Sequence, residues 1–181
     1  ILYVLVVVVY VYVLYKWVDR RNSHFARSSL MFQTLSELAS VLGLGGAELV
    51  RGRYDELASV NSSRRSVAGN VIGAMIIPFY IIYVFHFLNK DFVRHSERES
   101  ILIRELIGAL RERDPSLALS AEEFRTVGDR STLLYVILMI VTLGLFNVYW
   151  VYVLTKDPNE HFESHANVES KLIASFERIV A

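Results

Sequence analysis

Residues 132–154 have the sequence TLLYVILMIVTLGLFNVYWVYVL, without one acidic or basic side chain. Residues 67–88 (VAGNVIGAMIIPFYIIYVFHFL) likewise lack Asp, Glu, Lys and Arg, and residues 1–18 (ILYVLVVVVYVYVLYKWV) contain a single charge, Lys16. A helix needs about 20 apolar residues to cross the roughly 30 Å hydrocarbon core of a bilayer. The three runs therefore predict about three transmembrane helices, of which the first is marginal in length.

The rest of the composition supports a membrane protein. Hydrophobic residues make up 53% of the 181 positions, and three apolar helices would need more covering protein than the remaining residues supply. The 19 basic residues are balanced by 19 acidic ones, which argues against nucleic acid as a partner. The chain contains no cysteine and therefore no disulfide or thiolate site. We expect an all-α integral membrane protein.

Aromatic and basic residues mark the ends of the runs. Trp17, Tyr83 and Tyr152 are typical of the lipid–water boundary, and Lys90 and Lys156 follow the second and third runs. The first run lacks a basic leader and a small-residue cleavage site, so we expect a membrane helix that can be cut short at its start, and not a signal peptide.

The predicted organisation alternates membrane runs with polar arms. Transmembrane helices are expected at 1–18, 67–88 and 132–154, arm and lead-in helices at 19–66 and 89–131, and a C-terminal amphipathic helix at 155–181. Alternatively, the second and third runs re-enter on their own side, using the break at Pro78 or at residues 142–144. The Lys and Arg counts of the arms leave the membrane orientation open.

An internal repeat is also predicted, because segments 91–103 and 161–173 align without gaps. The arms carry apolar residues at helical spacing. Asp114-Pro115 and residues 43–46 (GLGG) should end two of these helices, whereas residues 157–160 (DPNE) and 120–123 (SAEE) should begin two others. The identical pairs are Phe92/Phe162, His95/His165, Glu99/Glu169, Ser100/Ser170, Leu102/Leu172 and Ile103/Ile173.

Residues 141–156 (VTLGLFNVYWVYVLTK) resemble a recurrent motif, T-x-G-[IL]-[YF]-x-x-Y-W-x-Y, followed here by a junction containing Asp157 and Asn159. The motif is similar to that of an uncharacterised prokaryotic family of small integral membrane proteins, and the match lies mainly within residues 141–170. The resemblance implies a helical protein of unknown function in a prokaryotic cell membrane. It supplies no catalytic residues to carry over.

His161 and His165 form an H-x-x-x-H pair, which places both imidazoles on one face of a helix at a spacing that metal ligands use. The corresponding positions in the other copies are Asp91/His95 and His24/Ser28. No glutamate follows the first histidine, as a zincin requires, so structural or interfacial histidines are favoured. If a metal binds and the repeats face one another, Asp91, His95, His161 and His165 are the set to test.

The other candidate residues lie within the apolar runs. His86 could bind haem or carry a proton, although its place near the end of its run favours an interfacial role. Asn70 and Asn147 could line a pathway or bond across helices, and Pro78 and Gly144 are interpreted as helix-packing or kinking positions. Acidic pairs such as residues 97 and 99 are interpreted as part of solvated helix faces.

Three hypotheses for the function follow. The leading one is a non-catalytic accessory or scaffolding subunit that associates with the lipid bilayer and with other membrane subunits or with itself. The second is a small transporter or channel built from the repeats around Asn70, Pro78 and Asn147. The third is a haem- or metal-binding redox subunit. No cofactor is predicted outright, and we expect no enzymatic activity.

Overall fold

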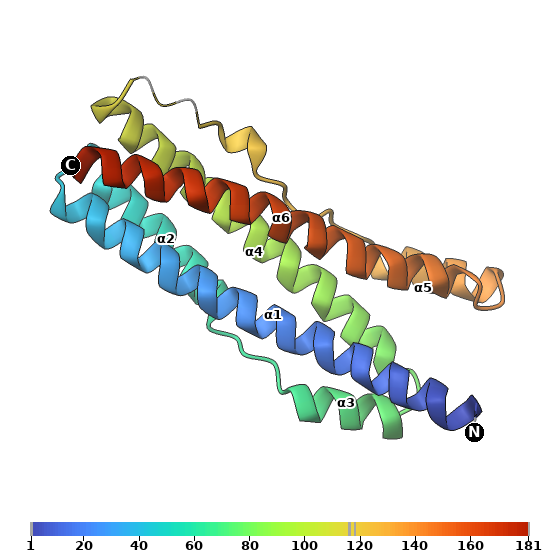
Figure 1. Cartoon of the computed structure of the whole chain (residues 1–181). Helices are drawn as coiled ribbons and strands as arrows, with labels where there is room; N and C mark the ends of the chain where they lie inside the picture. Colours follow the sequence, from blue (N-terminus) through green and yellow to red (C-terminus); the bar gives the residue numbers. More distant parts are fainter. Residues whose placement is uncertain (1, 116, 118, 181) are drawn as a thin grey trace.

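Three long helices run side by side through the molecule (Figure 1). The computed structural model describes residues 2–115, 117 and 119–180, and every regular element in these ranges is helical, which confirms the all-α prediction. The long helices are α1 (Leu2–Val41), α4 (Tyr80–Arg113) and α6 (Phe146–Val180). Helix α2 (Ala47–Asn61) packs against α1 and α4 at one end, and a 3-10 turn, η1 (Ala121–Glu123), contacts α4.

The second and third apolar runs are hairpins, which corrects the expectation of one continuous helix for each. The first hairpin joins α3 (Val67–Ile76) to α4 through a turn that contains Pro78 and Phe79, whose φ is 61°. The second joins α5 (Thr132–Val141) to α6 through Leu143 and Gly144, whose φ of +91° suits glycine. Among the described helices, one, α1, is long and apolar enough to cross a membrane.

Both hairpins begin with an Arg-Ser pair. The hydroxyl groups of Ser66 and Ser131 accept hydrogen bonds from backbone N–H groups in the first turns of α3 and α5, as N-caps do. Arg65 pairs with Asp91 of α4, and the residue before Ser131 pairs in the same way with Asp157 of α6. Because each aspartate pairs with the arginine before its hairpin, Asp91 corresponds in the structure to Asp157. The ungapped sequence alignment instead pairs Asp91 with residue 161. The internal repeat itself stays a prediction.

The polar junctions do not interrupt the long helices. The DPNE segment does not begin a helix, because α6 continues through Pro158 and Asp157 binds an arginine instead of capping. The segment SAEE forms only the 3-10 turn, in which Ser120 accepts from the Glu122 N–H group. The predicted ends are confirmed: α4 stops at Arg113, before Asp114-Pro115, and α1 stops just before the GLGG segment.

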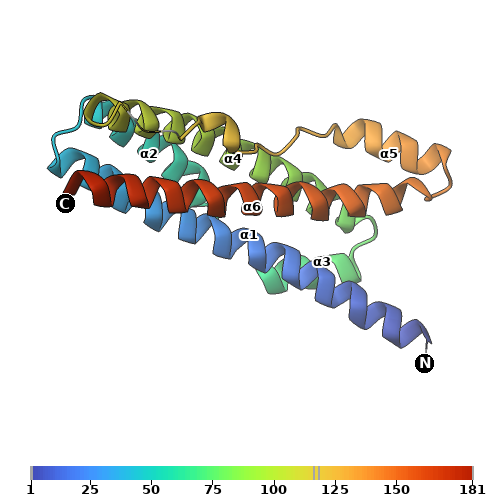
Figure 2. The same cartoon turned by 45° about the horizontal axis from the view of Figure 1, so that its top comes forward.

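The molecule is layered along its length. A distal core is formed where α1, α2, α4 and α6 meet, and a second core lies where the hairpins join the long helices. Ion pairs of Asp91 and Asp157 with arginines lie between them and form a charged layer. The N-terminal end of α1, α3 and α5 gather at the end opposite the C-terminus (Figure 2). We call this part, residues 2–15, 67–83 and 132–152, the apolar end.

Candidate metal centre

Four histidines and one glutamate converge where α1, α4 and α6 pack together. His24 comes from α1, His95 and Glu99 from α4, and His161 and His165 from α6. His24 Nε2 lies 3.1 Å from His161 Nε2 and 3.0 Å from His95 Nε2. Glu99 Oε2 lies 3.2 Å from His95 Nε2 and 3.4 Å from His161 Nε2. We call His24, His95, Glu99 and His161 the histidine centre; all four are buried, and their ligand atoms lie within 4.8 Å of one another.

Outer partners fix the orientation of two of the rings. His95 Nδ1 lies 2.8 Å from Asn61 Oδ1, while the amide nitrogen of Asn61 donates to two other oxygen atoms. His161 Nδ1 lies 2.9 Å from the carbonyl oxygen of Arg125, which can only accept. Each Nδ1 therefore carries the hydrogen, and a neutral ring of this tautomer presents a lone pair on Nε2. Outer hydrogen bonds of this kind orient histidine ligands in metal sites.

The two oxygen atoms of Glu99 have different surroundings. Ser28 Oγ and His165 Nε2 both donate to Oε1, the latter over 2.8 Å. No group in the described part of the chain donates a hydrogen bond to Oε2, although this atom is buried. The Nε2 atoms of His95 and His161 lie 3.2 and 3.4 Å from it and face it with lone pairs. An unpaired carboxylate oxygen facing two lone pairs is a costly arrangement, and a cation between them would stabilise it.

Burial and neighbouring charges lower the pKa values of some groups in the cluster and raise the pKa of His165. Burial lowers the pKa of His24 to about 2 and also lowers that of His95, so both rings are neutral. Burial disfavours ionised Glu99, but the protonated imidazole of His165, which donates to its Oε1, favours the anion, and the pKa of Glu99 falls well below its usual value. Burial likewise opposes protonation of His165, yet Glu99 and Glu169 raise its pKa to about 9. Glu99 and His165 are thus a buried ion pair.

These pKa shifts predict that the metal-free protein is most stable near pH 6.5. Protonated His165 contributes stability that is fully present below its unfolded pKa of about 6.5, and that contribution, roughly 3 kcal/mol, is lost as pH rises through about 9. Neutral His24 acts in the opposite sense, because below pH 6.5 the unfolded chain binds a proton that the folded site does not. Thermal melts of chelator-treated protein at pH 5, 6.5 and 9.5 measure both slopes.

The control for this pH dependence is His165→Gln, which should flatten the alkaline side and leave the acidic side in place. A melting temperature that rises between pH 6.5 and pH 9.5 in the unsubstituted protein would contradict the assignment of charge to His165.

The arrangement of α5 and α6 places the C-terminal histidines against the other helices. Residues 130–177 match DUF4234, a domain of unknown function. The predicted resemblance to an uncharacterised family is thereby confirmed for this segment. The comparisons find no match to the chain among curated proteins and none among solved structures.

The DUF4234 segment supplies only part of the centre. It contains the α5–α6 hairpin and the pair His161 and His165, whereas His24, His95 and Glu99 come from the preceding 129 residues. The described site therefore needs helices from outside the DUF4234 match.

The structure places the predicted metal candidates as follows. His95 and His161 belong to the histidine centre, and His165 donates a hydrogen bond to Glu99. Asp91 lies elsewhere, because its carboxylate is paired with Arg21 and Arg65, 2.9 Å from each. It is therefore not a ligand of this site.

The remaining candidates are separate from the centre and from one another. His86 Nδ1 lies 2.8 Å from Thr132 Oγ1, at the surface between α4 and α5. Asn70 is buried within its own hairpin, where Tyr80 donates to its Oδ1 over 3.2 Å, and Asn147 is exposed at the start of α6. The two remaining residues, Pro78 and Gly144, lie in the hairpin turns.

Sequence reasoning missed two members of the centre. Glu99 was expected on a solvated face with its neighbour at position 97, but it is fully buried. His24 was noted only as the counterpart of the histidine at position 161. The spacing of His95 and Glu99 could have identified Glu99 as a candidate ligand. His95 lies four residues, or about one helical turn, before Glu99, so both side chains lie on one face of the helix.

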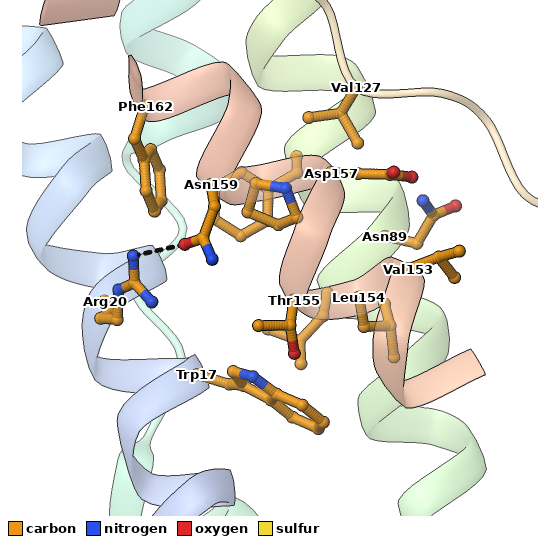
Figure 3. Close-up of a pocket in the computed structure, with 13 residues that line it drawn as sticks. Trp17, Arg20, Asn89, Val127, Val153, Leu154, Thr155, Asp157, Asn159 and Phe162 are labelled. Carbon is orange, nitrogen blue, oxygen red and sulfur yellow. Dashed lines mark hydrogen bonds between the residues drawn. The ribbon is translucent and has the colours of Figure 1, made fainter. Parts of the chain in front are cut away.

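A layer of side chains closes the centre on the side of the charged layer. The ring of Phe162 lies 4.4 Å from that of His24, and the Arg20 guanidinium lies 5.1 Å from the centre of the Phe162 ring. Arg20 is held by a 2.8 Å hydrogen bond to Asn159 (Figure 3). The adjoining cavity between α1, α4 and α6 measures about 20 Å³, the space of roughly one water molecule. It does not accommodate an organic substrate.

Proposed function

We propose that this protein is a non-catalytic, membrane-inserted subunit whose histidine centre binds one transition-metal ion and thereby links its three long helices. One observation carries the proposal: Glu99 Oε2 is buried without a donor among the described residues and faces the lone pairs of His95 and His161. A cation is the partner that satisfies a carboxylate oxygen and two imidazole nitrogens at once.

The spacing of the four atoms supports an ion of this size. They form a quadrilateral with sides of 3.0, 3.1, 3.2 and 3.4 Å. An ion at the middle of these four atoms would lie about 2.0–2.3 Å from each of them, whether the atoms form a flat square or a tetrahedron. These distances are close to the usual Zn–N and Zn–O lengths. Three imidazoles and one carboxylate suit Zn²⁺, Fe²⁺, Co²⁺ or Cu²⁺ better than Mg²⁺ or Ca²⁺, which prefer oxygen ligands.

The surroundings favour a structural ion over a catalytic one. Four protein ligands complete a tetrahedral shell, whereas a catalytic zinc keeps one position open for water or substrate. Burial of all four residues and the small adjoining cavity fit the closed kind of site. Because the ligands come from α1, α4 and α6, the bound ion would hold the three helices in one relative arrangement.

The accessory role rests on the exposed apolar end. Large hydrophobic side chains there, including Leu2, Phe79 and Leu143, are 76%, 79% and 94% exposed, which favours burial in lipid or against another membrane subunit. A transport pathway is not proposed, because Asn147 is exposed and Asn70 bonds within its hairpin. Haem is not proposed either, because imidazole nitrogens only about 3 Å apart leave no room for a macrocycle between them.

Metal binding is tested on the full chain, purified in mild detergent, stripped with chelator and titrated with Co²⁺. We expect one ion per chain, visible d–d absorption, displacement by Zn²⁺ and no competition from Mg²⁺. His161→Ala should abolish the absorption, and His86→Ala, which removes a histidine outside the centre, should leave it unchanged. Equal binding by His161→Ala and the unsubstituted protein would refute the proposal.

A further inference from the structure

The apolar end exposes large hydrophobic side chains from three separate segments. Besides the N-terminal part of α1, the hairpins formed with α3 and α5 reach this end (Figure 1). At the hairpin tips Phe79 is 79% exposed, and Leu143 and Leu145 are 94% and 77% exposed. No Asp, Glu, Lys or Arg occurs in residues 67–88 or 132–154. Such a surface is too large and too free of charge to face water.

The hairpin helices are too short to cross a bilayer. Helices α3 and α5 contain 10 residues each, which gives a length of about 15 Å. The hydrocarbon core is about 30 Å thick, so each tip reaches only about its middle.

Ion pairs fix both ends of each hairpin at one level. Arg65, which precedes α3, contacts Asp91 beyond the apolar part of α4, with Nη2 and Oδ1 3.0 Å apart. Arg130, which precedes α5, contacts Asp157 of α6 over 2.8 Å. A run that crossed the membrane would place the two partners of each pair on opposite faces, about 30 Å apart.

Side chains next to the ion pairs have the character of a membrane boundary. Tyr83 of α4 and Tyr152 of α6 are the last residues of their apolar segments, and Lys16, Trp17 and Lys156 follow the segments along the chain, before or next to the charged layer. Aromatic rings and long cationic stems at this level suit the headgroup region of phospholipids.

We propose that the two hairpins are re-entrant and insert into one leaflet of a phospholipid bilayer, so that the residues before and after each hairpin lie on the same side. The acyl chains of that leaflet cover the two hairpins, and the charged layer lies among the headgroups. The histidine centre then lies on the same side, just outside the membrane. This topology rests on the hairpins and their ion pairs and is independent of metal binding.

The test uses pairs of cysteines, which is straightforward because the chain contains none. The double variants Ser63→Cys/Glu97→Cys and Thr126→Cys/Glu163→Cys place exposed cysteines on either side of each hairpin. Vesicles of phosphatidylcholine and phosphatidylglycerol containing each variant are treated with a membrane-impermeant maleimide, permeabilised, and treated with a second maleimide of different mass. Intact-protein mass spectrometry then reports the labels on each chain.

Re-entrant hairpins give chains that carry two copies of the same label, whichever way the protein inserted. Chains with one copy of each label would show that the run crosses and would overturn the proposal. Ile77→Cys and Leu145→Cys, near the two tips, should react at least 10-fold more slowly in vesicles than Ser63→Cys, and at a comparable rate in denaturant. Equal rates in vesicles would show that the apolar end is not in lipid and that another partner covers it.

Discussion

Replacing Glu99 by glutamine is expected to lower the affinity of the histidine centre for Zn²⁺ by more than about 100-fold, beyond the 10–100-fold that loss of an outer partner costs. The substitution preserves the shape of the side chain but removes the anionic ligand. The new amide group can also donate to the lone pairs of His95 and His161, which face Oε2 at 3.2 and 3.4 Å. The site would then be satisfied without an ion. Competition against a chromophoric chelator measures the affinity.

The matched comparison is Asn61→Ala, which removes the partner of His95 Nδ1 and leaves all four ligands in place. This variant should lose 10–100-fold in affinity. If Glu99→Gln binds Zn²⁺ as tightly as the unsubstituted protein, Glu99 is not a ligand and the proposed centre is wrong.

Replacing Asp91 by asparagine is expected to lower the free energy of unfolding by about 3–5 kcal/mol, the usual loss when one partner of a buried ion pair is removed. The Arg21 side chain is only 1% exposed, and its Nη2 lies 2.9 Å from the Asp91 carboxylate. Asparagine fills the same volume but leaves the guanidinium charge without an anion. Reversible denaturation in mixed micelles, followed by circular dichroism, gives the difference.

Asp157→Asn is the control for this effect. Its partner, Arg130, has a side chain that is 34% exposed, so water can solvate the charge and the loss should be about 1 kcal/mol or less. Equal losses in the two variants would show that Arg21 is not the source of the difference. Metal affinity should change little in either variant, because neither aspartate belongs to the histidine centre.

The helical class and the C-terminal ends of α1 and α4 could be predicted from the sequence because they depend on local chemistry, whereas the helix starts expected at residues 157–160 and 120–123 were wrong. Pro115 and the glycines after α1 stop helices through their own backbone properties. The turn at Gly144 was recognisable as a break, but the choice between crossing and re-entry was not. The hairpin fold of this run brings Arg130 against Asp157, and a single sequence does not specify such contacts.

The site could be predicted only in part, for the same reason. The H-x-x-x-H spacing identified His161 and His165, because it is a property of one helix. Glu99 was misplaced because the arginines around it suggested a solvated helix, whereas the packing of α1 and α6 against α4 buries it completely. Asp91 was included among the candidate metal ligands because the ungapped alignment pairs it with His161, whereas in the structure it corresponds to Asp157 as the partner of an arginine.

The wide separation of the ligands along the chain also orders events during synthesis. His24 and His161 are 137 positions apart, and their contact is among the most distant in the molecule. Such non-local contacts form late in folding, because the loop between them must first be closed. The ribosome releases His24 and His95 well before α6 exists, so an ion captured early would meet an incomplete set of ligands and bind weakly. On the proposed function, full-affinity loading would report that the last helix has docked.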